Sequence, residues 1–352
     1  MERRKSRQIK LGGVAIGGGA AISIQSMTNT KTADVAATVS QIRALATTGA
    51  DIVRCAIPDM QAAEAVAELV AAAPVPLVAD IHFDHRLALQ SIAGGIDGLR
   101  INPGNIGSEQ KVREVLAAAA ERGVPIRIGI NGGSLEKDLL DKYGASAEAM
   151  VESALRHVAI CERCNFENIK ISMKSSSVTK TVSAYELLAR RVDYPFHVGV
   201  TETGTLLRGS IKSALGIGIL LHEGVGDTIR VSLTGDPLQE VTVAKDILRG
   251  LGLRQEGIEL ISCPTCGRTK VDLVAMVTAA EQALAGFTPK RPLTVAVMGC
   301  EVNGPGEARE ADYGVASGNG VGLLLRAGEV IGKFAESEII DRLIEEIRRN
   351  ES

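Results

Sequence analysis

Tryptophan is absent from this sequence of 352 residues, and aromatic residues make up only 3% of it. The sequence therefore offers no set of aromatic side chains on which nucleobases stack. Its formal net charge of −3 provides no overall attraction to nucleic acids or to anionic lipids. Any affinity for anions must come from the places where individual basic residues lie.

Long apolar runs are also absent. The longest candidate, Ile211 to Leu221, contains Lys212 and is shorter than the ~20 residues that cross a bilayer. The basic start, Glu2 to Arg7, is not followed by the apolar stretch of a secretory signal. We therefore expect a cytoplasmic protein with no membrane or nucleic-acid partner. Its six cysteines are then metal ligands or buried thiols rather than disulfides.

Short β-branched runs alternate with amphipathic segments over the first two thirds of the chain. An apolar fraction of 45% is ample for a packed core, and 38 glycines suit tight turns between strands and helices. The eight predicted strands are Ala21–Gln25, Asp51–Ala56, Pro76–Asp80, Gly98–Ile101, Pro125–Ile130, Asn168–Met173, Pro195–Val200 and Asp227–Leu233. The predicted helices between them include Thr32–Thr47, Ser108–Arg122, Ala145–Arg163, Leu206–Glu223 and Pro237–Leu251.

Apolar strands that alternate with helices indicate a parallel sheet buried on both faces. Eight such units over roughly 230 residues fit an α/β fold of the (β/α)₈ TIM-like barrel type. We assign residues 1–252 to this barrel, as a substrate-binding domain. An open, doubly wound sheet is the alternative fold.

Polar side chains stand at or just after the end of every predicted strand. They are Gln25, Arg54, Asp80, His82, Arg100, Asn102, Arg127, Asn131, Lys174, Thr201, Glu202, Arg230 and Ser232. In a barrel the carboxyl ends of the strands form the floor of the active site, so these side chains are expected to converge. His197 lies early in its strand and fits either a core position or the site.

Five of these residues are cations: Arg54, Arg100, Arg127, Lys174 and Arg230. Only Asp80 and Glu202 offset them locally. A single arginine in a strand is usually a solvated or ion-paired residue, but five at matching strand ends are costly unless an anion neutralises them. The pattern predicts a multiply charged anionic substrate, most simply a diphosphate.

The pattern changes after Gly252. A strand at Ile258–Ser262 leads into Cys263 and Cys266, and a strand at Leu293–Met298 leads into Cys300 and a glycine-rich loop that carries Glu307. A helix ending near Ala285, further strands at Tyr313–Ala316, Val321–Leu325 and Glu329–Phe334, and a final helix at Ser337–Arg349 complete the unit. We predict a smaller α+β domain over residues 253–352.

Three cysteines on two strand–loop junctions indicate a metal centre. Structural zinc sites normally close with cysteine or histidine, and residues 253–352 contain no histidine. This favours an iron–sulfur cluster with Glu307 as an oxygen ligand, while zinc and no metal remain alternatives. Cys161 and Cys164 lie late in a predicted helix without further ligands nearby, and Cys55 lies inside a strand, so these three are interpreted as packing thiols.

Several blocks of the sequence resemble the 4-hydroxy-3-methylbut-2-enyl diphosphate synthase family of the methylerythritol phosphate pathway. The resemblance covers essentially the whole chain. The blocks are Arg3–Arg7, Gln25–Asn29, Val198–Gly204, Gly226–Ser232, Cys263–Cys266 and Cys300–Glu307. One departure is Glu301, where the family pattern leads us to expect an apolar residue beside the cluster cysteine.

The resemblance implies a (β/α)₈ barrel joined to a domain with one 4Fe–4S cluster per subunit, held by Cys263, Cys266, Cys300 and Glu307. It implies a head-to-tail homodimer in which the cluster domain of one subunit covers the barrel mouth of the other. Flavodoxin or ferredoxin would supply the electrons, and no Gly-x-Gly-x-x-Gly signature follows a strand to indicate a bound nicotinamide.

The implied reaction converts 2-C-methyl-D-erythritol 2,4-cyclodiphosphate to (E)-4-hydroxy-3-methylbut-2-enyl diphosphate. The cations would bind the phosphates, and Glu202 is the candidate general acid, with Asp80 and His82 as orienting groups. Asn303 would contact substrate from the partner subunit. Two other functions compete with this interpretation: a redox-silent barrel enzyme on a phosphorylated or pterin-like substrate with a zinc-containing second domain, and an iron sensor that binds RNA or protein.

Overall fold

The computed structural model describes residues 2–102, 105–106, 108–300 and 302–352. The chain folds into two compact units, one that ends at Arg254 and one that begins at Gln255. Each unit has its own hydrophobic core.

The first unit is a barrel of eight parallel strands. They are β3 (Ser23–Met27), β4 (Ile52–Ala56), β5 (Leu77–Asp80), β6 (Gly98–Ile101), β7 (Ile126–Asn131), β8 (Ile169–Lys174), β9 (His197–Val198) and β10 (Thr228–Ile229). The hydrogen-bonded order runs β8-β7-β6-β5-β4-β3-β10-β9. A parallel bridge between Ile171 and Phe196 joins the two ends of this order, so the sheet closes on itself. This confirms the predicted barrel over the open-sheet alternative.

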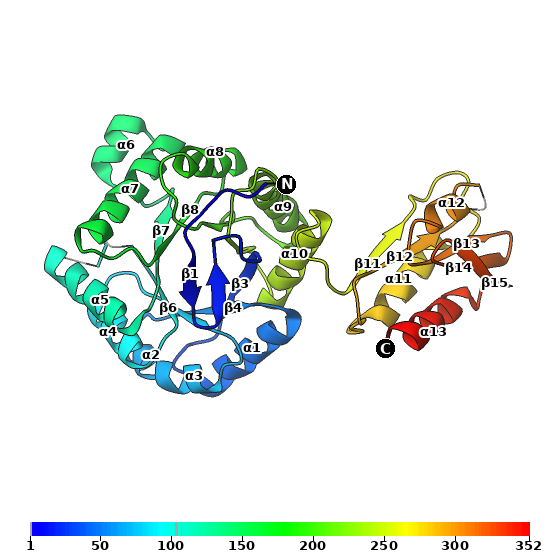
Figure 1. Cartoon of the computed structure of the whole chain (residues 1–352), viewed down its shortest axis with the longest axis horizontal. Helices are drawn as coiled ribbons and strands as arrows, with labels where there is room; N and C mark the ends of the chain where they lie inside the picture. The colour runs from blue at the N-terminus through cyan, green and yellow to red at the C-terminus, as the bar shows by residue number, and fades with distance from the viewer. Residues whose placement is uncertain (1, 103–104, 107, 301) are drawn as a thin grey trace. The chain divides into compact units, whose positions relative to one another are not determined.

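Helices surround the strands as an outer ring (Figure 1). They are α1 (Val35–Thr48), α2 (Met60–Glu64), α3 (Val66–Ala72), α4 (His85–Ala93), α5 (Glu109–Arg122), α6 (Lys137–Tyr143), α7 (Ala147–Arg163), α8 (Val178–Ala189), α9 (Leu206–His222) and α10 (Pro237–Gly250). Their ends follow local chemistry. The Asp34 side chain accepts a hydrogen bond from the Ala37 amide at the start of α1, and Gly49 ends that helix with a left-handed φ of 115°.

A hairpin that the sequence did not indicate closes the amino-terminal end of the barrel. Its strands β1 (Ile9–Leu11) and β2 (Val14–Ile16) are antiparallel, and Figure 1 shows it crossing the middle of the strand ring. Ile9, Leu11 and Ile16 form an apolar cluster with Ile52 and Val78 of the barrel. Because each strand has only three residues, its alternation was too short to be recognised by periodicity.

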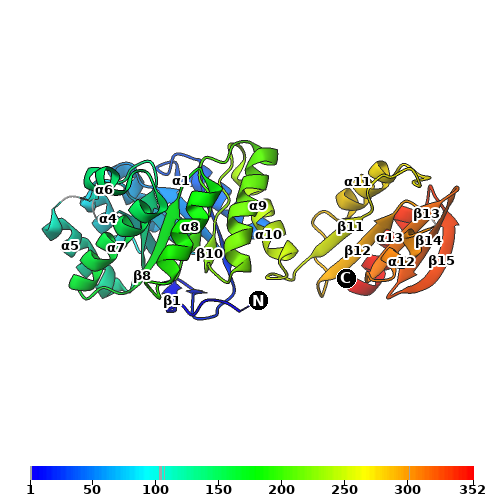
Figure 2. The ribbon, with the colours of Figure 1, turned by 90° about the horizontal axis from the view of Figure 1, so that it is seen from above.

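The second unit is a five-stranded mixed sheet with helices on both faces (Figure 2). Its elements are β11 (Ile258–Ser262), α11 (Leu273–Leu284), β12 (Leu293–Met298), α12 (Gly304–Ala308), β13 (Tyr313–Gly318), β14 (Val321–Arg326), β15 (Glu329–Ala335) and α13 (Ile339–Glu351). Helices α11 and α13 pack on one face, and α12 packs on the other. Residues Gly304–Ala308, which were predicted to be a loop, form a short helix instead. Pro305 suits its first turn, because proline is favoured there.

None of the helices in the described residues is long and apolar enough to span a membrane.

Candidate active site

The interior of the barrel is polar on most of its strands. Along β8, Ile169, Ile171 and Met173 belong to the apolar core under the helices, whereas Lys170 and Lys174 lie on the opposite side of the strand. Arg54 likewise lies between Val53 and Cys55, which pack into that core. Since successive side chains of a strand point to opposite faces, these basic residues point into the barrel.

Asp80 is the carboxylate around which the β4–β6 side of the mouth is organised. Its Oδ1 accepts a hydrogen bond of 3.1 Å from Arg100 Nη1, and its Oδ2 lies 3.6 Å from Arg54 Nε. His82 Nε2 lies 3.7 Å from Oδ1 and 3.2 Å from Arg100 Nη1. Burial alone would raise the pKa of Asp80, but Arg54, His82 and Arg100 together hold that pKa well below its usual range.

Arg127 lies deeper and is 2% exposed. Its Nη1 donates a 2.9 Å hydrogen bond to Oε1 of Gln25, which is 1% exposed. The Arg127 Nε and the Gln25 Nε2 are buried without a hydrogen-bond partner in the described part of the chain. Buried donors of this kind are costly, and a bound ligand or water that accepts from them relieves the cost.

Glu240 of α10 orients Arg230 at the β10 side of the mouth. Arg230 Nη2 lies 3.4 Å from Glu240 Oε2, and the same carboxylate accepts from the Leu233 amide at 3.0 Å. Ser26 Oγ lies 3.5 Å from Oε2. Glu240 was not among the site residues predicted from the sequence. A signal was present, because Glu240 falls on the buried face of an amphipathic helix, where an unpaired carboxylate is costly.

Two glycines allow the cations to approach the strands. A Cβ at Gly129 would lie 2.5 Å from Arg100 Nε, and one at Gly199 would lie 3.0 Å from Lys174 Nζ. Lys174 is buried, and burial together with Arg230, Arg127 and Arg54 lowers its pKa well below the ordinary value. The cations that the sequence predicted to converge therefore do so. The structure adds Lys170, which is 1% exposed and which the sequence analysis left without a role.

Glu202 lies on the loop after β9, and its side chain is exposed. Its φ of 55° is left-handed, a conformation that non-glycine residues rarely adopt outside constrained sites. The neighbouring residues hold it there, since the Thr201 amide donates to the Ser175 carbonyl at 3.2 Å and Thr203 Oγ1 donates to the Ser232 carbonyl. The backbone of Glu202 is thus held from both sides at the carboxyl end of the strands.

The remaining predicted residues stand where strands end. Asn102 directly follows β6, and Asn131 is the last residue of β7, where it pairs in register with Lys174. Thr201 and Ser232 lie just beyond β9 and β10. His82 is largely exposed beside Asp80. All of them are at the carboxyl ends of strands, which form one face of a barrel.

The mouth therefore carries a large excess of positive charge. The cations are Arg54, Arg100, Arg127, Lys174 and Arg230, and the buried carboxylates paired with them in the described part of the chain are Asp80 and Glu240. Guanidinium groups bind phosphate oxygens through paired N–H donors, and a buried cluster of like charge is stabilised by an anion. The arrangement is suited to a polyanion with more than one phosphate.

The second unit brings two cysteine-bearing loops together. Strands β11 and β12 are parallel neighbours, with Ser262 opposite Val297. Their ends place Cys263 beside the loop of Cys300, and the Gly299 amide donates to Cys263 Sγ at 3.4 Å. The amides of Asn303, Gly304 and Val302 lower the pKa of Cys300, and the amide and side chain of Arg268 lower that of Cys266. A lowered pKa increases the fraction of each thiol that is present as thiolate, the form that binds metals.

The other cysteines behave differently. Burial raises the pKa of Cys55 to about 11 and that of Cys161 to about 12, so these thiols stay protonated. Cys164 is half-buried at the end of α7. Their placement is that of packing residues.

The fit of a metal centre follows from the donor set. No three histidine, cysteine or carboxylate side chains in the described residues converge on a single point as they would around one ion. A 4Fe–4S cluster has iron at separate corners of a cube, so its ligands surround it instead of meeting. The loops lower the pKa values of Cys266 and Cys300, and residues 253–352 contain no histidine. Both observations fit an iron–sulfur cluster better than a zinc ion.

Glu307 and Asn303 lie on the same loop region as Cys300. Glu307 is in the first turn of α12, its amide donates to the Asn303 carbonyl at 3.1 Å, and both side chains are exposed. The departure at Glu301 lies outside the described residues.

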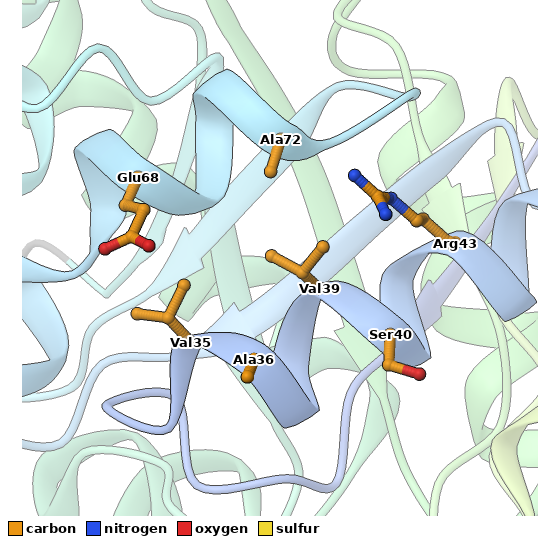
Figure 3. A pocket seen from close by; sticks show the side chains of 7 residues that line it. All are labelled: Val35, Ala36, Val39, Ser40, Arg43, Glu68 and Ala72. Atoms are coloured by element: carbon orange, nitrogen blue, oxygen red, sulfur yellow. The ribbon is translucent and has the colours of Figure 1, made fainter.

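One groove on the outer surface of the barrel is unrelated to this chemistry. It has a volume of about 440 Å³ and lies between α1 and α3. Figure 3 shows its lining of small and apolar side chains with Arg43 and Glu68 at its edge. It has neither a cysteine nor a group of cations, so it does not have the properties of an anion or cluster site.

Comparisons with known proteins agree with both halves of this description. The family model described as the GcpE TIM-barrel domain matches residues 6–245, and the model described as the GcpE protein C-terminal domain matches residues 259–349. A 4-hydroxy-3-methylbut-2-en-1-yl diphosphate synthase (flavodoxin) of Geobacter sulfurreducens is 59% identical over 99% of this chain and 98% of its own length. The proteins of that name from Maridesulfovibrio salexigens and Clostridium perfringens are 59% and 55% identical, over 96% and 98% of this chain and 94% and 98% of their own lengths.

Proposed function

The chain belongs to the GcpE family of 4-hydroxy-3-methylbut-2-en-1-yl diphosphate synthases, and we propose that its barrel mouth binds the substrate while its second unit holds one 4Fe–4S cluster. The enzyme is an oxidoreductase of isoprenoid precursor synthesis that converts 2-C-methyl-D-erythritol 2,4-cyclodiphosphate to (E)-4-hydroxy-3-methylbut-2-enyl diphosphate. Since one oxygen leaves as water, the conversion consumes two electrons and two protons. The redox-silent alternative has no support among these relatives.

The cations of the barrel mouth bind the two phosphates. Arg54, Arg100, Arg127, Lys174 and Arg230 supply the positive charge, and Gln25, Asn102, Asn131, Thr201 and Ser232 supply neutral polar groups at the same strand ends. Opening the ring leaves negative charge on the phosphate oxygen that departs from carbon. Fixed donors already aimed at that oxygen stabilise the charge as it develops.

Glu202 is the proton donor to the departing hydroxyl. Its constrained, exposed position on the loop after β9 supports this role. Asp80 and His82 orient Arg100, which contacts both of them. A carboxylic acid within reach of the leaving oxygen turns hydroxide, a poor leaving group, into water.

Cys263, Cys266, Cys300 and Glu307 would hold the cluster. When bound, such a cluster supplies the electrons of the reaction one at a time. The lowered pKa values of Cys266 and Cys300 and the adjacency of Cys263 to the Cys300 loop support this ligand set. The relatives are named for flavodoxin, so flavodoxin is the proposed electron donor, with ferredoxin as a substitute, in the cytoplasm.

A homodimer is proposed for two reasons besides the family resemblance. Helix α9 exposes an apolar stripe at intervals of four residues: Leu207, Ile211, Leu215 and Ile219. Phe83 near the barrel mouth is 72% exposed and Val302 beside Cys300 is 65% exposed. Exposed apolar groups of this kind are typical of surfaces that a partner covers. A head-to-tail arrangement would cover both sites and would let Asn303 of one subunit reach the substrate of the other.

The excess of cations at the barrel mouth is the observation that carries the substrate assignment. Its test is the affinity of anaerobically purified enzyme for the cyclic diphosphate, measured by calorimetry. Replacing Arg230 with Met is expected to weaken binding by tenfold or more, because a charge-assisted pair with phosphate is lost. Arg43→Met, in the outer groove of Figure 3, is the matched control and should bind normally. Equal affinities in the two variants would remove the substrate from the mouth.

A further inference from the structure

A layer of nitrogen donors lies in the barrel interior beside Arg127, one of the residues assigned to the substrate. Lys170 is 1% exposed, and its Nζ has no hydrogen-bond partner among the described residues. It pairs in register with Arg127 on β7. His197 on β9 is fully buried, with Nδ1 2.7 Å from Thr228 Oγ1 and Nε2 without a partner in the same described set.

This layer differs from the interior of most (β/α)₈ barrels, which branched apolar side chains fill. A buried ammonium group normally has a carboxylate beside it. The charged groups that face Lys170 are instead Arg127 on β7 and Arg54 on β4, and His197 lies in the same layer. Three carboxylates are buried in the described part of the barrel unit, and each already has a cationic partner: Asp80 pairs with Arg100, Glu240 with Arg230 and Asp227 with Arg3.

Burial and like charge act on Lys170 in the same direction. Burial foremost, and then Arg127 and Arg54, lower the pKa of Lys170 well below its ordinary value. The imidazole of His197 is also kept neutral, because burial together with Arg127, Lys174, Lys170 and Arg54 lowers its pKa. Arginine cannot release a proton in practice, so the Lys170 amine and the His197 imidazole are the groups of this layer whose charge can change.

The layer is closed off from the amino-terminal end of the barrel. The hairpin side chains Ile9, Leu11 and Ile16 pack against Ile52 and Val78 and close the amino-terminal end with an apolar cluster. Lys170 is 1% exposed, so little water screens it from a charge that binds beside Arg127 at the mouth.

We propose that Lys170 is an uncharged amine in the free enzyme and takes up a proton from solvent when a diphosphate binds at the barrel mouth. The inference rests on the proposed binding of the substrate at the mouth. Two phosphates above Arg127 replace a purely positive environment by a nearly neutral one, and the ammonium form of Lys170 then becomes favourable. Opening of the ring adds negative charge on the phosphate oxygen that leaves carbon, so the ammonium form of Lys170 becomes more favourable as the reaction proceeds.

The sign of the pH dependence follows from this exchange. Binding raises the pKa of Lys170, so protons are taken up at every pH between its values in the free and the bound enzyme. Affinity for the diphosphate is expected to fall as the pH rises through that window, and to level off above and below it.

Calorimetry tests the proposal directly. The cyclic diphosphate is titrated into anaerobic holoenzyme at one pH in buffers of different ionisation enthalpy, and the slope of the observed enthalpy gives the protons taken up. The wild-type enzyme is expected to take up about one proton within the window. Lys170→Met should lose this uptake and bind roughly tenfold more weakly, as loss of one charge–charge contribution implies. Lys170→Arg, which is charged at the outset, should lose the uptake and keep its affinity.

One control and one comparison variant define the outcomes. Lys10→Met, on the exposed side of the hairpin, should retain both uptake and affinity. Wild-type enzyme that binds without proton uptake, or Lys170→Met with unchanged uptake, would overturn the proposal, as would an uptake that disappears only in Lys174→Met. If Lys170→Met does not fold, the wild-type enzyme and Lys170→Arg decide the matter. Normal dependence on Arg230 without proton uptake removes only this inference, whereas independence from Arg230 removes the proposed binding site as well.

Discussion

At the scale of single residues, three glutamates have three different proposed roles, whereas the cations of the barrel mouth share one. The cations act together, and several of them face the same space, so each one contributes a share of the binding. Glu202, Glu240 and Glu307 stand in three different environments: a constrained loop, a buried helix face and the first turn of α12. Substitutions at these three positions therefore test proton transfer, the orientation of a binding group and metal binding one at a time.

Glu202→Gln is expected to lower turnover by ~100-fold or more, because general acid catalysis typically contributes this much. The amide keeps the shape of the side chain and cannot donate a proton to hydroxide. Steady-state assays with reduced flavodoxin and the iron–sulfur absorption spectrum are the measurements. Glu223→Gln, an exposed change at the end of α9, serves as control. Turnover at the wild-type rate in Glu202→Gln would show that another group protonates the leaving oxygen.

Glu307→Ala is expected to reduce the iron and sulfide retained per subunit, because one of four cluster ligands is removed. Glu310→Ala, three residues along the chain and equally exposed, is the matched control. Iron and sulfide analysis with Mössbauer spectroscopy of the anaerobic proteins measures the effect. An unaltered spectrum and full activity in Glu307→Ala would contradict its role as a ligand.

Glu240→Gln is expected to raise KM about tenfold with a smaller change in kcat. Glu240 contacts Arg230 and the Leu233 amide, so its replacement disturbs the position of a substrate-binding side chain and removes no group of the chemical step. Gln keeps an acceptor for the Leu233 amide, which limits the effect on folding. A fall in kcat with unchanged KM would indicate that Glu240 acts in the chemical step instead of in binding.

At the scale of elements, the shortest pairing between neighbouring strands in the described part of the barrel is between β8 and β9, and we call it the seam. The bridge between Ile171 and Phe196 joins them, whereas β7 and β8 pair over six positions. The amino-terminal segment reinforces this seam. Arg4 lies over the Phe196 ring with its guanidinium carbon 4.1 Å from the ring centre, and it donates to the Val192 carbonyl at 2.8 Å. Gly224 allows this approach, since a Cβ there would lie 2.3 Å from the Glu2 carbonyl oxygen.

Arg4→Ala is therefore expected to lower the free energy of unfolding by about 1–2 kcal/mol, from the loss of a partly desolvated cation–π contact and a hydrogen bond. The thermal midpoint of the barrel should fall by a few degrees, as measured by circular dichroism. Lys5→Ala, at the exposed neighbouring position, should leave it unchanged. Equal midpoints for the two variants would show that the segment does not stabilise the seam.

At the scale of the whole molecule, the two units have separate cores, and the proposed cluster ligands all belong to the second. Metal binding contributes to the stability of the unit that supplies the ligands. Removing iron with a chelator under oxidising conditions is thus expected to lower the unfolding temperature of residues 255–352 while the barrel keeps its own transition. Scanning calorimetry measures this. A shift of both transitions by the same amount would mean that the units unfold together.

The sequence by itself determined most of the architecture. Five of the predicted barrel strands overlap the observed ones closely, and the first is shifted along the chain, from Ala21–Gln25 to Ser23–Met27. The last two were predicted too long, because β9 and β10 have only two residues each. Long apolar runs and glycine-terminated helices are local signals, so they can be read without knowing what packs against them. The three cysteines and the cations at strand ends were visible for the same reason, since their positions relative to the strands are local.

Only the tertiary structure decided the charge environment and the closure of the barrel. The partnership of Arg230 with Glu240, the contact of Arg100 with both Asp80 and His82, and the isolation of Lys170 depend on neighbours from other strands. The hairpin Ile9–Ile16 was missed because strands of three residues are stabilised by the apolar cluster that they complete and not by their own pattern. Burial and Coulomb interactions act through space, and residues distant in sequence set them.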